Sequence, residues 1–297
     1  DLAFIHYSFS ILGQNGAMQT NNTNITRGFA ARAALSNAAG RFDMPCDQVD
    51  DGWFPEPEPT HIDTETRLEV ARSMISYNRS PDLPFDRSIN PYRGCEHGCI
   101  YCFARPSHAY LGLSPGLDFE TKLIARPNAS DILRQELRAK RYKVAPLAIG
   151  TNTDPYQPVE KEYELTRKCL TVLSEFNHPV AIVTKGAMIE RDIDILAPMA
   201  AKGLVRVGIS VTTLDTGLAR RMEPRVPTPT RRLATIRRLT DAGVPVRIMV
   251  SPVVPGLTDH EIEALLAAGA EAGADAATWI MLRLPREVSE LWQQWLA

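Results

Sequence analysis

The chain has 297 residues, of which 44% are hydrophobic and 23% are charged, and its net charge is −2 with a pI of about 6.4. This is the composition of a globular protein with enough apolar residues for a full core, and no global basic charge indicates nucleic-acid binding. No apolar run reaches the length of a membrane-spanning helix, and the cysteine usage fits a reducing compartment, so we expect a cytoplasmic protein.

The first 63 residues lack the periodic pattern of the rest of the chain. Residues 18–50 are rich in Asn, Thr, Ala and Gly, and alternating proline and glutamate at 54–59 predict an extended linker. We expect residues 1–63 to be a loosely ordered tail, with Cys46 an incidental thiol, and residues 64–297 to form one domain. Met18 is a candidate native start and the chain stops inside a predicted helix, so we expect a fragment of a longer protein.

Two short segments lead from the tail to the regular part of the chain. A helix is predicted over residues 64–75, where Leu68, Ala71 and Met74 recur at helical spacing. Residues 78–93 contain three prolines and are predicted to be mostly turns, with a short strand near 88–90.

From residue 128 onward, predicted helices alternate with short buried strands. The strands are expected over residues 146–151, 180–184, 205–211, 246–250 and 279–284. The helices are expected over residues 128–141, 160–176, 190–202, 229–242 and 258–273, with a last one from 285. Asn128 or Ser130 can cap the first helix, Gly203 ends the third, and Thr258 with Glu261 has the spacing of a capping box.

This alternation predicts about six βα units, a parallel sheet and right-handed crossovers. Either an open doubly wound sheet or a curved partial barrel satisfies the pattern. In both, functional side chains gather at the carboxyl ends of the strands.

Cys95, Cys99 and Cys102 lie within eight residues at the spacing CxxxCxxC. Three thiolates on one loop suit an iron–sulfur cluster, and a four-iron cube held by three cysteines leaves one iron open to a substrate or cofactor. A zinc site completed by His97 or His108 is the alternative, but no second cysteine pair follows. An odd cysteine count disfavours a disulfide framework, and a ferredoxin-like carrier needs a fourth ligand.

Polar residues follow several of the predicted strands. Thr153 and Asp154 come after the strand at 146–151, Lys185 after the next, and Ser210 lies at the end of the third. Lys185 can reach a carboxylate as a point charge, and Ser210 can hydrogen-bond a ribose. Each also has an ordinary interpretation, as a turn residue, a solvated lysine or a packing hydroxyl.

Two further features have structural interpretations. Seven arginines crowd one loop and helix, at positions 220, 221, 225, 231, 232, 237 and 238. They could contact phosphates, but we favour a solvated helix face balanced by Glu223 and Asp241. Cys169 occupies an apolar helical position and is expected to be a buried structural thiol.

The cysteine spacing, with the aromatic Tyr101 just before the last cysteine, resembles the signature of the radical S-adenosylmethionine (radical SAM) enzymes. The resemblance covers roughly residues 86–285 and implies an α/β fold, a partial (β/α)6 TIM-type barrel with parallel strands, with the cysteine loop after the first strand. It implies a 4Fe-4S cluster on Cys95, Cys99 and Cys102, with S-adenosylmethionine chelating the open iron. One electron then cleaves this cofactor to methionine and a deoxyadenosyl radical, which abstracts hydrogen from a substrate.

The resemblance also assigns further residues and a partner. Tyr101 would lie near the adenine, and Val253, within the fifth-strand segment 250–256, would help to hold it. Thr153 and Lys185 would hold the methionyl carboxylate, Asp154 would orient a cofactor or substrate group, and Ser210 would bind the ribose. A low-potential electron donor, flavodoxin or ferredoxin, is implied.

A narrower resemblance connects the chain to the spore photoproduct lyase relatives, often labelled DNA repair photolyase-like. It rests on residues 90–95, the Thr153-Asp154 and Thr184-Lys185 pairs, and residues 222–225. The lyase uses a cysteine as hydrogen donor at the position of Thr151, whose O–H bond is much harder to break homolytically. We therefore expect kinship rather than thymine-dimer repair, and the substrate stays open, nucleic acid included.

The alternative function is a non-catalytic zinc- or cluster-containing module that binds nucleic acid. It predicts no cofactor binding, affinity for DNA or RNA with steep salt dependence, and loss of that affinity when the arginines at 231–238 are changed. The slightly negative net charge and the polar strand ends disfavour this alternative.

Overall fold

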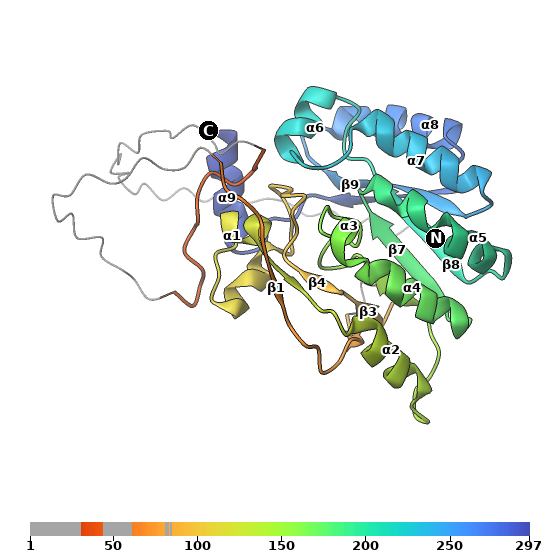
Figure 1. Ribbon diagram of the computed structural model, residues 1–297. Coiled ribbons are helices and arrows are strands. Elements are labelled where there is room, and N and C mark those ends of the chain that lie inside the picture. Colours follow the sequence, from red (N-terminus) through yellow and green to blue (C-terminus); the bar gives the residue numbers. More distant parts are fainter. Residues whose placement is uncertain (1–30, 44–60, 81–82, 84) are drawn as a thin grey trace.

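The computed structural model describes residues 31–43, 61–80, 83 and 85–297. A seven-stranded sheet of order β10-β9-β8-β7-β6-β3-β2 forms its centre (Figure 1). The strands are β2 (Ser76–Tyr77), β3 (Arg87–Ile89), β6 (Leu147–Ile149), β7 (Val180–Thr184), β8 (Val205–Ser210), β9 (Val246–Val253) and β10 (Ala276–Met281). The six from β3 to β10 are parallel, and only β2 pairs antiparallel, with β3.

Helices cover one side of this sheet. They are α2 (Ala129–Arg138), α4 (Leu165–Glu175), α5 (Ile193–Ala201), α7 (Pro229–Asp241) and α8 (Ile262–Glu271). Alternate strand residues, such as Val205, Val207 and Ile209, are buried in the core beneath them. The expected partial barrel of six βα units is therefore confirmed, with β10 and β2 as the two edges of the sheet in the described part of the chain.

A smaller sheet lies beside the first parallel strand. It has the order β1-β5-β4, formed by β1 (Glu65–Leu68), β4 (Tyr92–Arg93) and β5 (Lys122–Ala125). The helix predicted over residues 64–75 is therefore wrong. Glu65–Leu68 instead pairs in parallel with β5, because the hydrogen bonds of a sheet outweigh a weak local helical preference.

Several helix boundaries differ from those predicted. The helix expected over 160–176 consists of α3 (Glu160–Tyr163) and α4, separated by Glu164 at φ 53°. The helix expected over 190–202 begins as the 3-10 helix η2 (Ala187–Asp192) and continues as α5. The helix end predicted at Gly203 is confirmed, because Gly203 adopts φ 68° after α5, and Gly243 ends α7 in the same way at φ 77°.

The two predicted side-chain caps are wrong. Asn128 precedes α2, but its side chain pairs with the backbone of Ala71, 2.8 and 2.9 Å away. The Thr258 hydroxyl accepts from the Val254 N–H, and Glu261 accepts from the Thr213 hydroxyl at 2.8 Å. Partners distant in sequence thus replace the local capping bonds. Thr258 and Glu261 flank and end the 3-10 turn η3 (Asp259–Glu261).

The described part of the predicted tail packs against the domain. Ala33 and Ala34 are buried, and their backbone N–H groups donate to the carboxylate of Glu120 in α1 (Leu117–Thr121). Most of the tail, with Cys46 and the Pro-rich segment, lies outside the described residues. The domain boundary at residue 64 remains a prediction.

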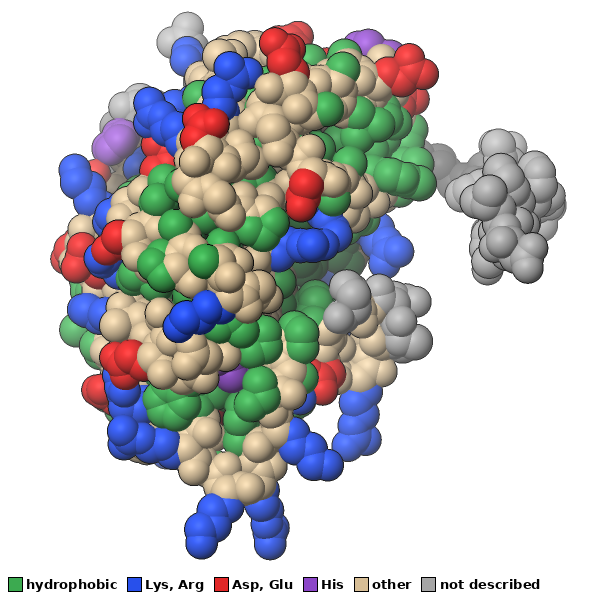
Figure 2. All heavy atoms as spheres, turned by 90° about the vertical axis from the view of Figure 1, so that its right-hand side faces the viewer, with side chains coloured by type: hydrophobic (Ala, Val, Ile, Leu, Met, Phe, Trp, Pro, Cys, Tyr) green, Lys and Arg blue, Asp and Glu red, His purple; other side chains and the backbone are tan. Residues whose placement is uncertain are grey.

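The outer surface carries charges of both signs. Figure 2 shows acidic and basic side chains interspersed over the side on which α5, α7 and α8 lie. Within the residues that the structure describes, no helix is both long and apolar enough to cross a membrane.

Candidate active site

The cysteine loop follows β4 and leads into the 3-10 helix η1 (Arg105–Leu111). Cys95 and Cys99 are buried, Cys102 is partly exposed, and none of the three forms a disulfide. The Cys95 N–H donates to the carbonyl of Phe119 at 2.9 Å, and the Ile100 N–H donates to the carbonyl of Met222 at 3.0 Å. The loop is thus held from both sides, by α1 and by α6 (Thr216–Met222).

A fully buried ion pair between Arg105 and Glu120 supports the cysteine loop. Arg105 donates to the carbonyls of Gly98 and Cys99, each at 3.0 Å, and pairs with Glu120 at 2.6 Å. Gly98 has φ 64°, and a Cβ there would lie 2.6 Å from a carboxylate oxygen of Glu120. Only glycine therefore allows the loop to lie this close to the ion pair. The sequence analysis missed the pair of Arg105 and Glu120. The only sequence signal for it is that both charged residues lie among mostly apolar neighbours.

The two histidines near the cysteines have other partners. His108 is buried, with Nε2 3.0 Å from the carbonyl of Lys122, and His97 Nδ1 lies 3.3 Å from Asp154 Oδ2. Among the described residues, no group of three or more His, Cys, Asp or Glu side chains is arranged to hold a metal ion. The zinc alternative named these two histidines as the fourth ligand, and in the structure each of them lies against an oxygen of the protein.

The three thiols need a nearby positive charge to ionise. Burial raises the pKa of Cys95, and Asp154 raises it further. Burial also raises the pKa of Cys99, which Glu223 raises further and Lys185 lowers, and burial raises that of Cys102. These groups become thiolates when a metal supplies the compensating charge. In type and number, the three free thiols match the protein ligands of a three-cysteine iron–sulfur cluster.

Asp154 connects the cysteine loop to two strand ends. Its carboxylate accepts from the Thr184 hydroxyl at 2.6 Å, the Lys185 N–H at 2.7 Å and the Tyr156 N–H at 2.9 Å. Burial alone would raise the pKa of Asp154, but His97 and these donors lower it to about 2. The sequence analysis expected Asp154 to orient a cofactor or substrate group. In the structure, its oxygens are engaged within the protein.

Lys185 and Ser210 lie together at the ends of β7 and β8. The Lys185 Nζ donates to the Ser210 hydroxyl at 2.6 Å, and this hydroxyl donates to the carbonyl of Ser251 at 3.0 Å. The same Nζ is 5.8 Å from the ring centre of Tyr101 and 3.8 Å from Glu223. With its side chain only 15% exposed, Lys185 is not a solvated loop lysine.

Glu223 is a buried hub that the sequence analysis did not assign to the site. The hydroxyls of Tyr101 and Thr212 donate to its Oε1, and Arg232 donates to its Oε2 at 2.7 Å. Arg232 also donates to the carbonyl of Ser210 at 2.8 Å. Burial would raise the pKa of Glu223, but Arg232 and Lys185 lower it. Glu223 thus joins the cysteine loop, through Tyr101, to the strand ends.

The prediction that the seven arginines lie on a solvated face is wrong for Arg232. Arg232 is 1% exposed, because it lies on the side of α7 that faces the sheet. Arg231 and Arg238 pair with Glu190, and Arg225 pairs with Glu96. These arginines therefore have carboxylate partners within the chain, which does not favour a phosphate-binding face.

The remaining predicted residues are buried near the same end of the sheet. The Thr153 hydroxyl donates weakly to the carbonyl of Tyr92 at 3.4 Å, and no hydrogen bond joins Thr153 to Lys185. The carbonyl of Val253 accepts from the N–H of Leu282 at 2.9 Å. Cys169 is fully buried in the core beneath the helices, as predicted, and burial raises its pKa to about 12.

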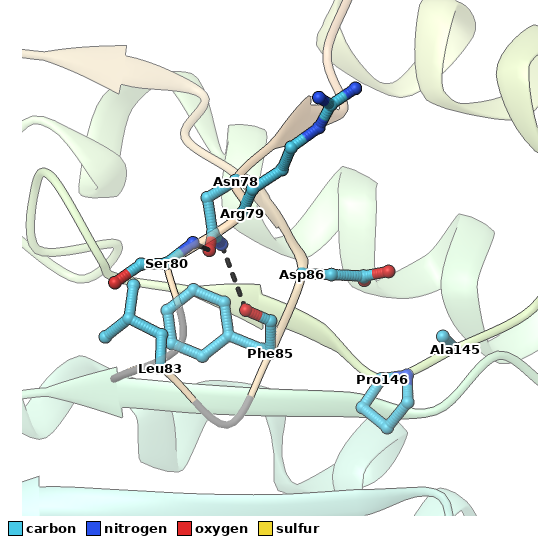
Figure 3. Close-up of a pocket in the computed structure, with 8 residues that line it drawn as sticks. All are labelled: Asn78, Arg79, Ser80, Leu83, Phe85, Asp86, Ala145 and Pro146. Atoms are coloured by element: carbon cyan, nitrogen blue, oxygen red, sulfur yellow. Dashed lines mark hydrogen bonds between the residues drawn. The ribbon is translucent and has the colours of Figure 1, made fainter.

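Apolar side chains cover the cysteine loop. Cys99 and Tyr101 pack with Met222 of α6 and with Leu291 and Trp292 of α9 (Glu287–Leu296). A separate hollow of about 500 Å³ lies at the opposite end of the sheet, between the β2–β3 turn and the start of β6 (Figure 3). The candidate residues thus lie at the carboxyl ends of the strands, and this hollow lies at their amino ends.

The family model of the radical SAM superfamily matches residues 89–268, which include the cysteine loop and most of the barrel. The chain belongs to the radical SAM superfamily. Radical SAM proteins use a 4Fe-4S cluster and S-adenosylmethionine, and the three free thiols described above fit such a cluster.

Two relatives illustrate the range of this similarity. An uncharacterized protein of Mycobacterium tuberculosis is 41% identical over 217 residues, which are 72% of this chain and 64% of that protein. The chain thus spans less than two thirds of the length of this relative. A radical SAM Nalpha-GlyT isomerase of Pseudomonas phage M6 is 26% identical over 177 residues, 58% of this chain and 34% of the phage protein.

Solved structures show the same fold. A variant of spore photoproduct lyase with bound AdoMet and dinucleoside spore photoproduct superposes with a TM-score of 0.59 at 16% identity. The superposition covers 77% of this chain and 66% of the lyase. At this identity the likeness concerns the fold of the radical SAM barrel.

Proposed function

We propose that the chain is a radical SAM enzyme in which Cys95, Cys99 and Cys102 hold the cluster and the neighbouring strand ends hold S-adenosylmethionine. When bound and reduced by one electron, these cofactors supply a deoxyadenosyl radical that abstracts hydrogen from the substrate. The observation that carries the proposal is the convergence of Lys185, Ser210 and Glu223 beside the cysteine loop.

The roles of these residues follow from their charges. Lys185 presents an ammonium group that can neutralise the cofactor carboxylate, and Glu223 lies 3.8 Å from its Nζ. Ser210 presents a hydroxyl that can turn from the Ser251 carbonyl to a ribose. Thr153 is a second candidate for the carboxylate, while Tyr101 and Val253 are candidates for the adenine side.

Asp154 has a positioning role in this proposal. It receives hydrogen bonds from the end of β7 and lies against His97 of the cysteine loop. Asp154 therefore fixes the position of the loop relative to the Lys185 backbone. Together with the apolar cover from Leu291 and Trp292, this arrangement limits the access of water to a reactive intermediate.

The electron comes, in this proposal, from a low-potential protein such as a flavodoxin or a ferredoxin. Cys102 is the most exposed of the three cysteines, so we expect the electron to enter on its side of the loop.

The test is anaerobic. The chain is reconstituted with iron and sulfide, reduced with dithionite and mixed with S-adenosylmethionine, and deoxyadenosine is measured. We expect deoxyadenosine from the wild type and from Cys169→Ala, the matched control in the core, and none from Cys99→Ala. Binding of one zinc ion without iron, or equal yields from both variants, would contradict the proposal.

A further inference from the structure

The inner face of the barrel is the side of the sheet opposite the helices. Strand alternation places Arg206 and Gly208 of β8 and Arg247 and Met249 of β9 on this face, because their neighbours are buried beneath the helices. A Cβ at Gly208 would lie 2.6 Å from the sulfur of Met249 and 3.6 Å from a methyl group of Val183, which shows that these side chains share the face.

Arg206 and Arg247 are diagonal neighbours on adjacent strands. Gly208 is the register partner of Arg247, and Arg206 is two residues earlier on the same strand. Standard strand spacing then puts the two Cα atoms about 8 Å apart, so both guanidinium groups can reach one group between them. Gly208 on one side and Ala276 on the other are small, which leaves room for the Arg247 side chain.

Neither arginine has a hydrogen-bond or ion-pair partner within residues 31–43, 61–80 and 85–297. The Nε of Arg247 is buried and unpaired, whereas the buried Arg105 and Arg232 each have a carboxylate partner. The strands β7, β8, β9 and β10 contain no Asp or Glu at all. Arg206 is exposed, whereas Arg247 is a partly buried cation without a partner, which is costly for the folded chain, so a ligand is the natural source of its counter-charge.

We propose that Arg206 and Arg247 form a subsite that binds a phosphate group of the substrate. The substrate role rests on the proposed function above. Ser210 lies on the same face of β8 as Gly208, two residues or about 7 Å further along the strand toward the cysteine loop. To reach the reaction centre, a substrate anchored at the two arginines has to extend along β8 from Arg206 to Ser210, four residues further on. Two guanidinium groups without a competing carboxylate match the double charge of a phosphate better than the single charge of a carboxylate.

The test measures binding of inorganic phosphate to the reconstituted full chain, by calorimetry at constant ionic strength with chloride as the reference anion. We expect saturable binding to the wild type and to Arg72→Gln, an exposed arginine outside the inner face. Arg206→Gln and Arg247→Gln should each weaken phosphate binding about tenfold or more. Equal affinity in all four proteins would overturn the subsite, and tighter binding of acetate than of phosphate would overturn the choice of phosphate.

A second measurement separates a binding role from a structural one. Without phosphate, Arg247→Gln should unfold at the same temperature as the wild type or higher, because the variant removes an unpaired charge. A lower unfolding temperature would assign Arg247 a structural role and overturn the proposal. Neither measurement depends on cofactor cleavage, so failure here leaves the deoxyadenosine assay as a separate test of the radical chemistry.

Discussion

Asp154 Oδ2 lies 3.3 Å from Nδ1 of His97, and this contact joins the cysteine loop to the end of the second parallel strand. The same carboxylate accepts from the backbone of Lys185 at the end of the third. A single buried side chain thus connects three segments that meet at the proposed cofactor site.

Asp154→Asn should destabilise the metal-free chain. The pKa of Asp154 is lowered from 3.8 to about 2, so its stabilising effect is present above pH 4 and is lost as the pH falls through 2. The shift corresponds to about 2 kcal/mol at neutral pH. Urea unfolding at pH 7 should show this loss, and the difference between variant and wild type should shrink toward pH 2. A constant difference across this range would contradict the assignment.

Lys185→Met should weaken binding of S-adenosylmethionine about 10- to 100-fold, because a charge-assisted hydrogen bond to the cofactor carboxylate is lost. Equilibrium binding of S-adenosylmethionine to the reconstituted chain measures this loss of affinity. Lys140→Met, at an exposed position just after α2, is the control and should bind as the wild type does. If both variants bind the cofactor equally well, Lys185 does not contact it.

Glu223→Gln should cost about 3–5 kcal/mol of stability, because Arg232 is then a buried cation without its counter-ion. The double variant Glu223→Gln/Arg232→Met removes both charges and should recover much of this loss. Denaturant unfolding of both single variants and the double variant measures the coupling. Additive losses would show that the two side chains do not depend on each other.

Gly98→Ala should reduce the iron bound after reconstitution, because its Cβ would lie 2.6 Å from Glu120. Gly112→Ala is a matched control, since Gly112 has nearly the same φ of 65° but no atom within 4 Å of an added Cβ. The control should keep its iron and lose only about 1 kcal/mol of stability. Iron and sulfide analysis distinguishes the two, and equal iron content would show that the loop tolerates the side chain.

The cysteine loop and the βα order were predictable because their signals are local. Cys95, Cys99 and Cys102 all lie within eight consecutive residues. The buried strands and the glycines after α5 and α7 likewise depend on near neighbours. The short strand β1 was missed, because its partner Lys122–Ala125 lies more than fifty residues away and only pairing with it makes residues 65–68 extended.

The sequence by itself determined the family signature, the six-unit parallel architecture and the strand ends that carry Lys185 and Ser210. Only the tertiary structure decided which polar side chains meet: Asp154 with His97, and Glu223 with Arg232. It also decided that Arg206 and Arg247 have no partner in the described part of the chain. The physical reason is that periodicity reports which face a residue occupies, whereas an ion pair depends on distances between elements that packing alone brings together.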